Sequence, residues 1–304
     1  MYDISIITVN YNSSDDTLKM IESVKNNTSV NYEMIVIDNA SAYDEYLKLE
    51  CITNKKNTTL YRSKLNVGFA AGNMLGIEKA SPNSKYYFFL NNDTLLINNV
   101  VDILFHTMEQ EKNIGLIAPQ LYDEKQQRST TFREFPSVSE KFFGKGFHQF
   151  ISTQKIYNYK KEYHEIIDVG IVSGASLFCK AEAFQKAGKF DTNFFLYCEE
   201  EDLSKRIKDI GYRVCLEPNA KLIHLCGKST LRNFHVEKEF VISYFYLVSK
   251  HHNLINSFLL KLNLTLKYLF KLHKDPIYKK LFLFCFKSQK STQSLKYQQK
   301  KLLK

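Results

Sequence analysis

Polar side chains follow three apolar stretches that are typical of buried strands. The transitions are Ile4–Val9 into Asn10, Met34–Ile37 into Asp38 and Asn39, and Tyr86–Leu90 into Asn91, Asn92 and Asp93. In an open α/β sheet, ligands bind outside the carboxyl ends of the strands. A carboxylate such as Asp93 can ligate Mg²⁺ or Mn²⁺, which bring substrate phosphates with them. We therefore predict an enzyme that handles a nucleotide-activated substrate, with a simple turn before a helix as the structural alternative for Asp93.

A run of four acids is the second candidate for chemistry. Glu199, Glu200, Glu201 and Asp202 follow the aromatic stretch 194–197 and begin a predicted helix. Acids in the first turn of a helix are stabilised by its macrodipole, so a purely structural role is the alternative. Crowded carboxylates repel each other, and one of them can hold a raised pKa that suits it to accept a proton. We favour a general base within this run.

His224 and several glycines complete the set of candidate residues. His224 ends a short predicted strand, so it is a candidate metal or phosphate ligand, with an ordinary structural histidine as the alternative. Gly68 and Gly72 do not form a Gly-x-Gly-x-x-Gly fingerprint, and no Walker lysine motif is present, which argues against dinucleotide dehydrogenases and P-loop NTPases. The small residues 173–175 would let a sugar or phosphate approach the backbone closely.

The elements that must position these residues alternate between strand and helix patterns. This alternation predicts an α/β fold with a mainly parallel sheet flanked by helices. Two short strands, Arg213–Leu216 and Lys221–Leu225, are expected at the end of the core. From Pro119 to Glu165 the periodicity weakens, which indicates a functional lid or a variable loop.

The net charge of +10 is concentrated near the C-terminus. Residues 244–304 carry 13 Lys, no Arg and one acid, a net charge of +12 that leaves −2 on the rest of the chain. A nucleic-acid-binding protein would be expected to carry basic residues, usually including Arg, over its folded face. We therefore expect a folded domain at 1–243 without a nucleic-acid partner, followed by a basic helical tail at 244–304.

Amphipathic spacing gives this tail a candidate partner. Lys267, Lys271 and Lys274 are spaced to share a helix face, and apolar surface comes from Leu262, Leu266, Leu269 and Leu272. A basic amphipathic helix can lie on an anionic membrane surface, which is our prediction for residues 250–304. Packing on the enzyme body or a dimer partner is the alternative. The polar residues 288–304 are expected to fray.

Cysteine usage and hydropathy indicate the compartment. The six cysteines form no Cys-x-x-Cys pair, which predicts reduced thiols and no zinc site. No signal-peptide pattern precedes the first strand, and no apolar run approaches the roughly 20 residues that span a bilayer. We expect a cytoplasmic protein that is peripheral on the inner face of the cell membrane.

Eight segments in order resemble the bacterial family 2 glycosyltransferases, especially the rhamnosyltransferase-like branch that builds surface polysaccharides. They cover about residues 3–230. The segments are Ile6–Asn12, Val36–Ser41, Asn66–Asn73, Phe89–Asp93, Ser173–Ala175, Phe190–Asp191, Phe195–Leu203 and His224.

The resemblance implies a GT-A fold and an inverting single displacement from a nucleotide-sugar donor, either dTDP-rhamnose or a UDP-hexose. The acceptor it implies is polyprenol-linked or an oligosaccharide. Asp93 and His224 would bind Mn²⁺ or Mg²⁺ on the diphosphate, and Glu200 would be the base, with Glu199 as the neighbouring alternative. Asp38 would read the base edge of the nucleoside. The implied donor-binding residues are Thr8, Asn10, Tyr11, Asp38, Asn39, Gly68, Asn73, Asn92, Gly174 and Ala175.

Two departures from the family pattern keep alternatives open. The usual Asp-x-Asp is Asn91-Asn92-Asp93 here, so one carboxylate is missing and metal dependence could be weaker. The usual Glu-Asp pair is Glu199-Glu200, and the acid run leaves the register ambiguous by one residue. A non-catalytic glycan-binding or scaffold subunit with the same fold is the alternative function. A nucleotidyltransferase is disfavoured because residues 10–13 lack the Gly-rich basic loop expected of that class.

Overall fold

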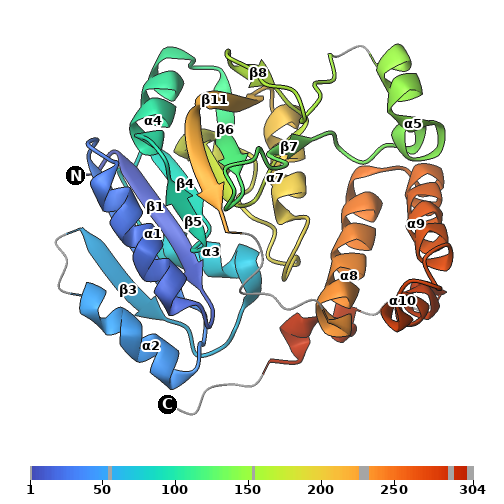
Figure 1. The fold of residues 1–304 in the computed structure, drawn as a ribbon, viewed down its shortest axis with the longest axis horizontal. Helices are drawn as coiled ribbons and strands as arrows, with labels where there is room; N and C mark the ends of the chain where they lie inside the picture. The colour runs from blue at the N-terminus through green and yellow to red at the C-terminus, as the bar shows by residue number, and fades with distance from the viewer. Residues whose placement is uncertain (1, 54–56, 153–154, 226–232, 287–290, 300–304) are drawn as a thin grey trace.

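A nine-stranded sheet forms the centre of the protein in the computed structural model, which describes residues 2–53, 57–152, 155–225, 233–286 and 291–299. The strand order is β3-β2-β1-β4-β10-β6-β11-β5, and β8 pairs with β11 (Figure 1). The strands are β1 (Ile4–Asn10), β2 (Tyr32–Asp38), β3 (Thr58–Arg62), β4 (Tyr86–Leu90), β5 (Thr94–Leu96), β6 (Ile114–Tyr122), β8 (Ile167–Asp168), β10 (Ser176–Lys180) and β11 (Arg213–His224). A separate two-stranded sheet joins β7 (Phe132–Arg133) to β9 (Ile171–Val172).

Strand directions make the sheet mixed but mainly parallel. β1, β2, β3 and β4 are parallel neighbours, and β6 is parallel to β11. β10 runs antiparallel between β4 and β6, and β5 and β8 are antiparallel to β11. The expected α/β architecture with a mainly parallel sheet is confirmed.

Helices cover both faces of the sheet because the strands are apolar on both faces. In β1, Ile4 and Ile6 join one buried cluster and Ile7 joins the other, as expected from the alternation of side chains along a strand. The first cluster includes residues of α1 (Ser14–Asn26), α2 (Tyr43–Leu49) and α4 (Val100–Gln110). The second includes residues of α3 (Gly68–Lys79), α6 (Ala181–Lys186) and α7 (Glu199–Asp209).

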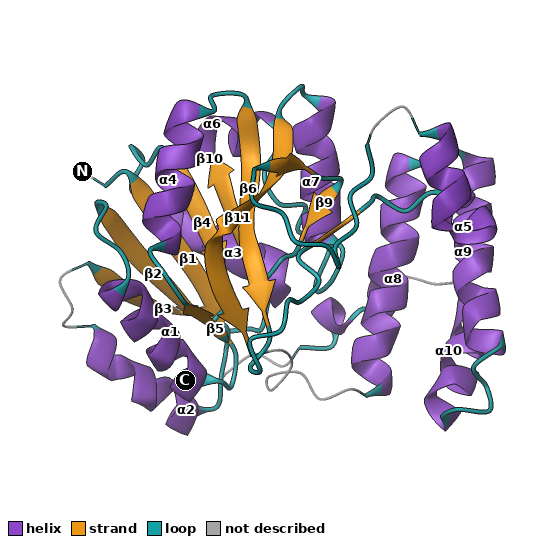
Figure 2. Ribbon diagram, turned by 45° about the horizontal axis from the view of Figure 1, so that its top comes forward, coloured by secondary structure: helices purple, strands orange, loops and turns teal. Residues whose placement is uncertain are grey.

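A third apolar cluster lies beside the sheet, in a helical layer that Figure 2 shows on its own side of the molecule. It is built by α8 (Phe234–His251), α9 (Leu254–Leu269) and α10 (Pro276–Phe286), together with Phe194 and Cys198 of the core. α8 therefore runs across the expected domain boundary between residues 243 and 244. In the part of the chain that the structure describes, no helix has both the length and the apolar character needed to cross a membrane.

The segment from Pro119 to Glu165 differs from the expected lid or loop. β6 continues to Tyr122, β7 follows, and α5 (Val138–Ile151) packs beside α9. α5 is kinked at Gly144, whose backbone is in the left-handed region with φ of 83°. The kink and the polar connections around it break the helical periodicity that sequence patterns detect.

Three further expectations are wrong. The two short strands at 213–225 form one strand, β11, whose irregular register falls between Glu217 and Lys221. α9 ends at Leu269, so Lys271 and Lys274 lie beyond the helix of Lys267. The expectation that residues 288–304 fray is wrong for 291–299, which form two 3₁₀ turns, η2 (Ser291–Gln293) and η3 (Leu295–Tyr297), the second of which follows the buried Ser294. Residues 288–290 and 300–304 lie outside the described residues.

Candidate active site

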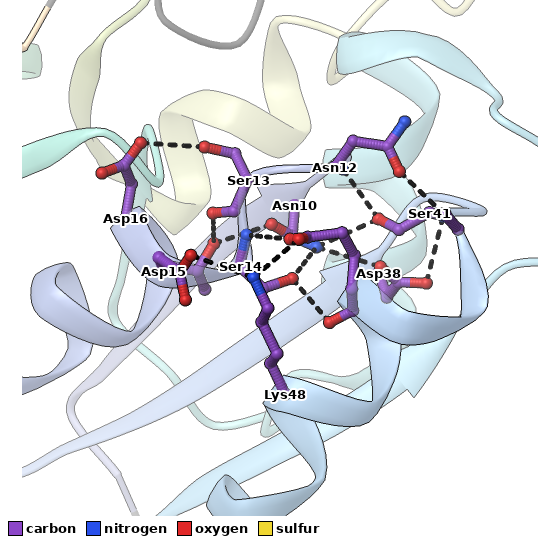
Figure 3. Close-up of polar contacts among 12 residues, drawn as sticks. Asn10, Asn12, Ser13, Ser14, Asp15, Asp16, Asp38, Ser41 and Lys48 are labelled. Atoms are coloured by element: carbon purple, nitrogen blue, oxygen red, sulfur yellow. Dashed lines mark hydrogen bonds and ion pairs between the residues drawn. The ribbon is translucent and has the colours of Figure 1, made fainter.

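The carboxyl ends of β1 and β2 are joined by a buried polar network. Asn10 and Asp38 are register partners, and Asn10 Nδ2 donates to Asp38 Oδ1 at 3.0 Å and to Ser41 Oγ at 3.1 Å (Figure 3). Asn92, which follows β4, donates from Nδ2 to Thr17 Oγ1 at 2.9 Å and to Asn10 Oδ1 at 3.4 Å. The ends of β1, β2 and β4 therefore lie together, as predicted, and are joined by hydrogen bonds among polar side chains.

Asp38 is fully buried by its own protein partners. Its Oδ2 lies 3.4 Å from Arg62 Nε, and the Arg62 guanidinium lies over the ring of Tyr46 at 4.3 Å from its centre. Thr8 and Asn73 are also buried, and Asn73 donates to the Phe69 carbonyl. Thr8, Asp38 and Asn73 do not line the cavity described in the next paragraph, so they lie behind its wall.

A cavity of about 350 Å³ opens at this end of the sheet. It is lined by Val9, Tyr11, Asn39, Asn66, Gly68, Phe69, Asn91, Asn92, Asp93, Phe195, Leu196, Asn233, Val236 and Leu295. Five of the expected donor and metal residues are among them. Most of the polar lining comes from amides and Asp93, and apolar lining comes from aromatic and aliphatic side chains. Such a mixture suits a ligand with both a ring system and charged groups.

Gly68 is needed where the two halves of the cavity wall touch. Its φ of +82° is left-handed, and a Cβ there would collide with the backbone carbonyl of Phe195. The next residue, Phe69, donates its N–H to that same carbonyl at 2.8 Å. Asn39 braces the loop by accepting from Val67 N at 2.9 Å and donating to Asn66 Oδ1 at 2.9 Å. A larger residue at position 68 would push the two walls apart.

Asp93 and His224 meet at the edge of the cavity. β11 pairs antiparallel with β5, which places His224 opposite Thr94, and His224 Nε2 lies 3.2 Å from Asp93 Oδ1. A carboxylate oxygen suits Mg²⁺ and Mn²⁺, and the imidazole nitrogen offers a second ligand. Among the described residues there is no group of three or more His, Cys, Asp or Glu that could hold a metal. The pair fits a divalent cation whose other ligands come from phosphate oxygens and water.

The acid run forms the first turn of α7. Two residues separate it from Phe195 and Leu196, which line the cavity. Backbone strain precedes it, because Tyr197 and Cys198 both have left-handed φ values, of 71° and 68°. Such strain in residues with bulky side chains concentrates at functional sites. Neither Glu199 nor Glu200 lines the cavity.

Glu199 and Glu200 have different environments, which separates their chemistry. Glu200 Oε1 accepts from Arg133 Nη2 at 2.9 Å, a charge-assisted hydrogen bond that fixes the position of this carboxylate. Glu199 is buried, and within the described chain its Oε2 has no hydrogen-bond partner. Burial raises the pKa of Glu199 well above its ordinary value, and the charge of Glu200 raises it further. Burial therefore favours the neutral form of Glu199.

Arg133 is a site residue that the sequence patterns did not reveal. It lies on β7, opposite Ile171 of β9, and contacts both Glu200 and Glu201. β7 is only two residues long and lies inside the segment expected to be a loop. Alternating apolar and polar residues at 131–133 were the available signal, but the run is too short to be distinguished from a loop.

Gly174 and Ala175 connect the acid run to the strand ends. A Cβ at Gly174 would make ordinary van der Waals contact with the Glu200 side chain, at 3.5 Å, so this backbone lies against the carboxylate. Ala175 is buried and accepts from Asn91 N at 2.9 Å. The backbone of Gly174 and Ala175 therefore contacts both the Glu200 side chain and Asn91, two residues before Asp93.

Comparison with known proteins identifies the class of this site. The model of glycosyl transferase family 2 matches residues 5–186, more than half of the chain. The chain belongs to this family. The resemblance to the rhamnosyltransferase-like branch is confirmed by relatives that carry that name.

Among these relatives, rhamnosyltransferase WbbL of Escherichia coli (strain K12) is 26% identical over 225 residues, 72% of this chain and 82% of that protein. An N-acetylglucosaminyl-diphospho-decaprenol L-rhamnosyltransferase of Mycobacterium tuberculosis (strain CDC 1551 / Oshkosh) is 32% identical over 85 residues, 27% of this chain and 28% of that protein. An uncharacterized glycosyltransferase of Rickettsia bellii (strain RML369-C) is 37% identical over 113 residues, 36% of this chain. That match spans only 16% of the Rickettsia protein.

The fold has a counterpart among solved structures. The crystal structure of GalNAc-T7 with UDP, GalNAc and Mn²⁺ matches with a TM-score of 0.56 and 16% identity, over 82% of this chain and 51% of that chain. At this level of identity the match establishes the GT-A fold alone.

Proposed function

We propose that this glycosyltransferase moves a sugar, with inversion, from a nucleoside-diphosphate donor to a hydroxyl of a lipid-linked or saccharide acceptor in surface polysaccharide assembly. The observation that carries the proposal is the Asp93–His224 pair, 3.2 Å apart, at the edge of a cavity built on strand ends. The names of the WbbL and decaprenol-linked relatives favour a rhamnosyl or hexosyl donor, dTDP-rhamnose or a UDP-hexose, and a polyprenol-linked acceptor.

In the proposed reaction, Glu200 is the base. It is the acid of the pair that forms an ion pair with Arg133, whereas burial raises the pKa of Glu199. Glu200 takes the proton from the acceptor hydroxyl as the acceptor oxygen forms a bond to the anomeric carbon. The bond from that carbon to the diphosphate oxygen breaks, and the nucleoside diphosphate leaves. Attack from the side opposite the leaving group inverts the anomeric centre.

The cavity residues are proposed to bind the donor. Asp93 and His224 would hold Mn²⁺ or Mg²⁺, which would supply neutralisation of charge on the diphosphate. Tyr11, which is 42% exposed, lines the cavity and offers a ring face on which the nucleobase can stack. Asn39 and Asn92 shape the polar wall, while Asp38 supports it from the buried network rather than reading the base directly.

The membrane is proposed as the location of the acceptor, at the inner face of the cell membrane. Large apolar side chains are exposed at the start of α9, where Leu254 is 90% and Ile255 is 72% exposed, and on α5, where Phe150 is 87% exposed. The two helices pack together, since Asn263 Nδ2 donates to the Lys141 carbonyl. Exposed apolar groups beside lysines suit an anionic lipid surface. The proposed membrane contact therefore includes α5 as well as residues 250–304, for which it was predicted.

A nucleotide panel tests the proposed function. UDP, dTDP, GDP and NAD are titrated into the protein by calorimetry, each with and without Mn²⁺. We expect one nucleoside diphosphate to bind, more tightly with Mn²⁺, and NAD not to bind. Absence of binding by every nucleoside diphosphate would contradict the proposal and favour the scaffold alternative.

A further inference from the structure

The C-terminal segment 291–299 returns to the core beside the N-terminal end of α8 (Figure 1). Its attachment is specific. Glu239 of α8 is 1% exposed, and its carboxylate accepts from Ser294 Oγ at 2.6 Å and from Leu295 N at 2.8 Å. Lys296 Nζ adds a bond to the Thr192 carbonyl at 2.8 Å. A buried carboxylate that uses both oxygens on one segment fixes the position of that segment.

The fixed segment presents Leu295 to the cavity that holds Asp93. Val236 lines the same cavity, and it lies on α8 one turn before Glu239, so the anchor and this part of the wall share a helix face. α8 is also bonded to another part of the cavity wall, because Ser243 Oγ donates to the carbonyl of the lining residue Leu196 at 2.8 Å. The aromatic ring of Phe240 packs on Tyr197 with ring centres 5.9 Å apart.

We infer that Leu295 contacts the bound nucleoside-diphosphate donor and that Glu239 is the positioning residue that places it there. The inference rests on the proposed function, and it adds a wall that lies outside residues 5–186, the part of the chain that matches the family. The C-terminal extension therefore has a second role beside the proposed membrane contact, which is to complete the donor cavity.

This arrangement predicts how donor affinity depends on the extension. Leu295→Ala removes apolar contact with the donor, so affinity falls about tenfold, the range for loss of aliphatic contact in a pocket. Leu295→Trp fills cavity volume and reduces affinity further. Glu239→Gln keeps one acceptor oxygen but loses the other, which loosens the segment and weakens binding about threefold.

The experiment is calorimetric titration of UDP and dTDP with Mn²⁺ into the full chain and these variants. Leu283→Ala, at a 51% exposed leucine of α10 that does not line the cavity, is the matched control. Thermal unfolding without nucleotide checks that each variant folds, and the added stability on binding gives a second measure of affinity. The donor KM should rise in the Leu295 variants with kcat nearly unchanged.

The two possible failures are distinguishable. Weaker binding in the Leu295 and Glu239 variants, with the Leu283→Ala protein equal to wild type, supports the inference. Wild-type affinity in every variant overturns the inference and leaves the proposed function standing. A wild-type protein that binds neither nucleotide overturns the proposed function and the inference together.

Discussion

Glu199 and Glu200 differ by one position and lie in different environments, since burial raises the pKa of Glu199 and Glu200 pairs with Arg133. Glu200→Gln removes the proposed base, so transfer should fall by about 10²- to 10⁴-fold. Donor affinity should stay near wild type, because Glu200 does not line the cavity. Glu199→Gln is the matched control and should keep most of the activity, since the raised pKa of Glu199 makes this side chain a poor candidate for the charged base. Initial-rate kinetics with both variants measure this, and loss of transfer in Glu199→Gln alone would reverse the assignment.

The raised pKa of Glu199 also has a consequence for stability. A carboxyl whose folded pKa lies above its ordinary value of 4.5 binds its proton more tightly in the folded state. Its contribution to the free energy of unfolding is full below about pH 4.5 and is lost as the pH rises through the folded pKa. Denaturant unfolding from pH 4 to 9 should therefore show a steeper loss of stability with pH in wild type than in Glu199→Gln. Parallel curves of the free energy of unfolding against pH for the two proteins would contradict the raised pKa of Glu199.

Arg133 is proposed to position Glu200 rather than to touch substrate. Arg133→Lys keeps the charge but loses the fork that contacts Glu200 and Glu201 together, so kcat should fall about tenfold. Arg133→Gln, which also removes the charge, should lower kcat further and leave donor affinity near wild type, because Arg133 does not line the cavity. A structural role alone would lower the midpoint of thermal unfolding without this loss of kcat, and kinetics together with unfolding of the two variants separate these outcomes.

At the residue scale, sequence patterns revealed the candidates that end strands or begin a helix and missed those placed by tertiary contacts. Asp93 and His224 could be proposed together because each follows a strand in a family-like order. Arg133 and Leu295 could not, since nothing local marks a two-residue strand or a short terminal turn as part of a site. Asp38 was a candidate because it ends a strand, but that position alone does not reveal that its side chain contacts Asn10 and Arg62 inside the protein.

At the element scale, an ion cluster joins α7 to α8. Asp202 is fully buried and contacts Arg206 of its own helix and Lys250 and His251 of α8, with Lys250 Nζ and His251 Nε2 each 2.7 Å from Oδ1. Burial alone would raise the pKa of Asp202, but the bonds from His251 and Arg206 lower it to about 2. The cluster therefore joins α8, which contributes Val236 to the cavity wall, to α7, which begins with Glu199 and Glu200.

Removing this carboxylate should destabilise the protein. Asp202→Asn is expected to lower the free energy of unfolding at pH 7 by about 2–4 kcal/mol, since it removes the buried carboxylate with which Arg206 and Lys250 pair. The wild-type contribution is present above the ordinary value of 3.8 and is lost as the pH falls toward about 2. Asp209→Asn on the exposed side of α7 is the control and should cost little. Equal denaturant midpoints for both variants would contradict this account.

Elements with strong periodicity were predictable, and elements held by tertiary packing were not. β1, β2 and β4 carry nearly continuous apolar runs, so their existence and buried position follow from the sequence. α5 contains Gly144 and has no buried side chain of its own, which removes the apolar stripe that marks a helix. α9 and α10 look continuous in their lysine and leucine spacing, but Pro276 begins a new helix after the turn at residues 270–275.

At the scale of the whole molecule, the proposed membrane face lies on the helical layer beside the sheet (Figure 2). Replacing Leu254, Ile255 and Phe258 together by Ser should weaken binding to phosphatidylglycerol vesicles at least tenfold, because each side chain loses roughly 1.5–3 kcal/mol of burial in lipid. Leu47→Ser on α2, also exposed, is the control. Nucleotide binding should persist in the triple variant, which deletion of the tail cannot guarantee if Leu295 contacts the donor.

Vesicle cosedimentation measures this prediction. Binding should also decrease from 0.1 M to 1 M salt, as the lysines lose their attraction to anionic lipid. Unchanged sedimentation of the triple variant would exclude this face as the membrane contact.

The central claim is a donor site built on Asp93 and His224, and one titration tests it most directly. The nucleoside diphosphate that binds best is titrated into wild type and Asp93→Asn, with Mn²⁺ and with EDTA, and Asp209→Asn serves as the control. We expect Mn²⁺ to strengthen binding at least tenfold in wild type and in the control, and to have little effect in Asp93→Asn. Equal strengthening by Mn²⁺ in all three proteins would contradict the claim.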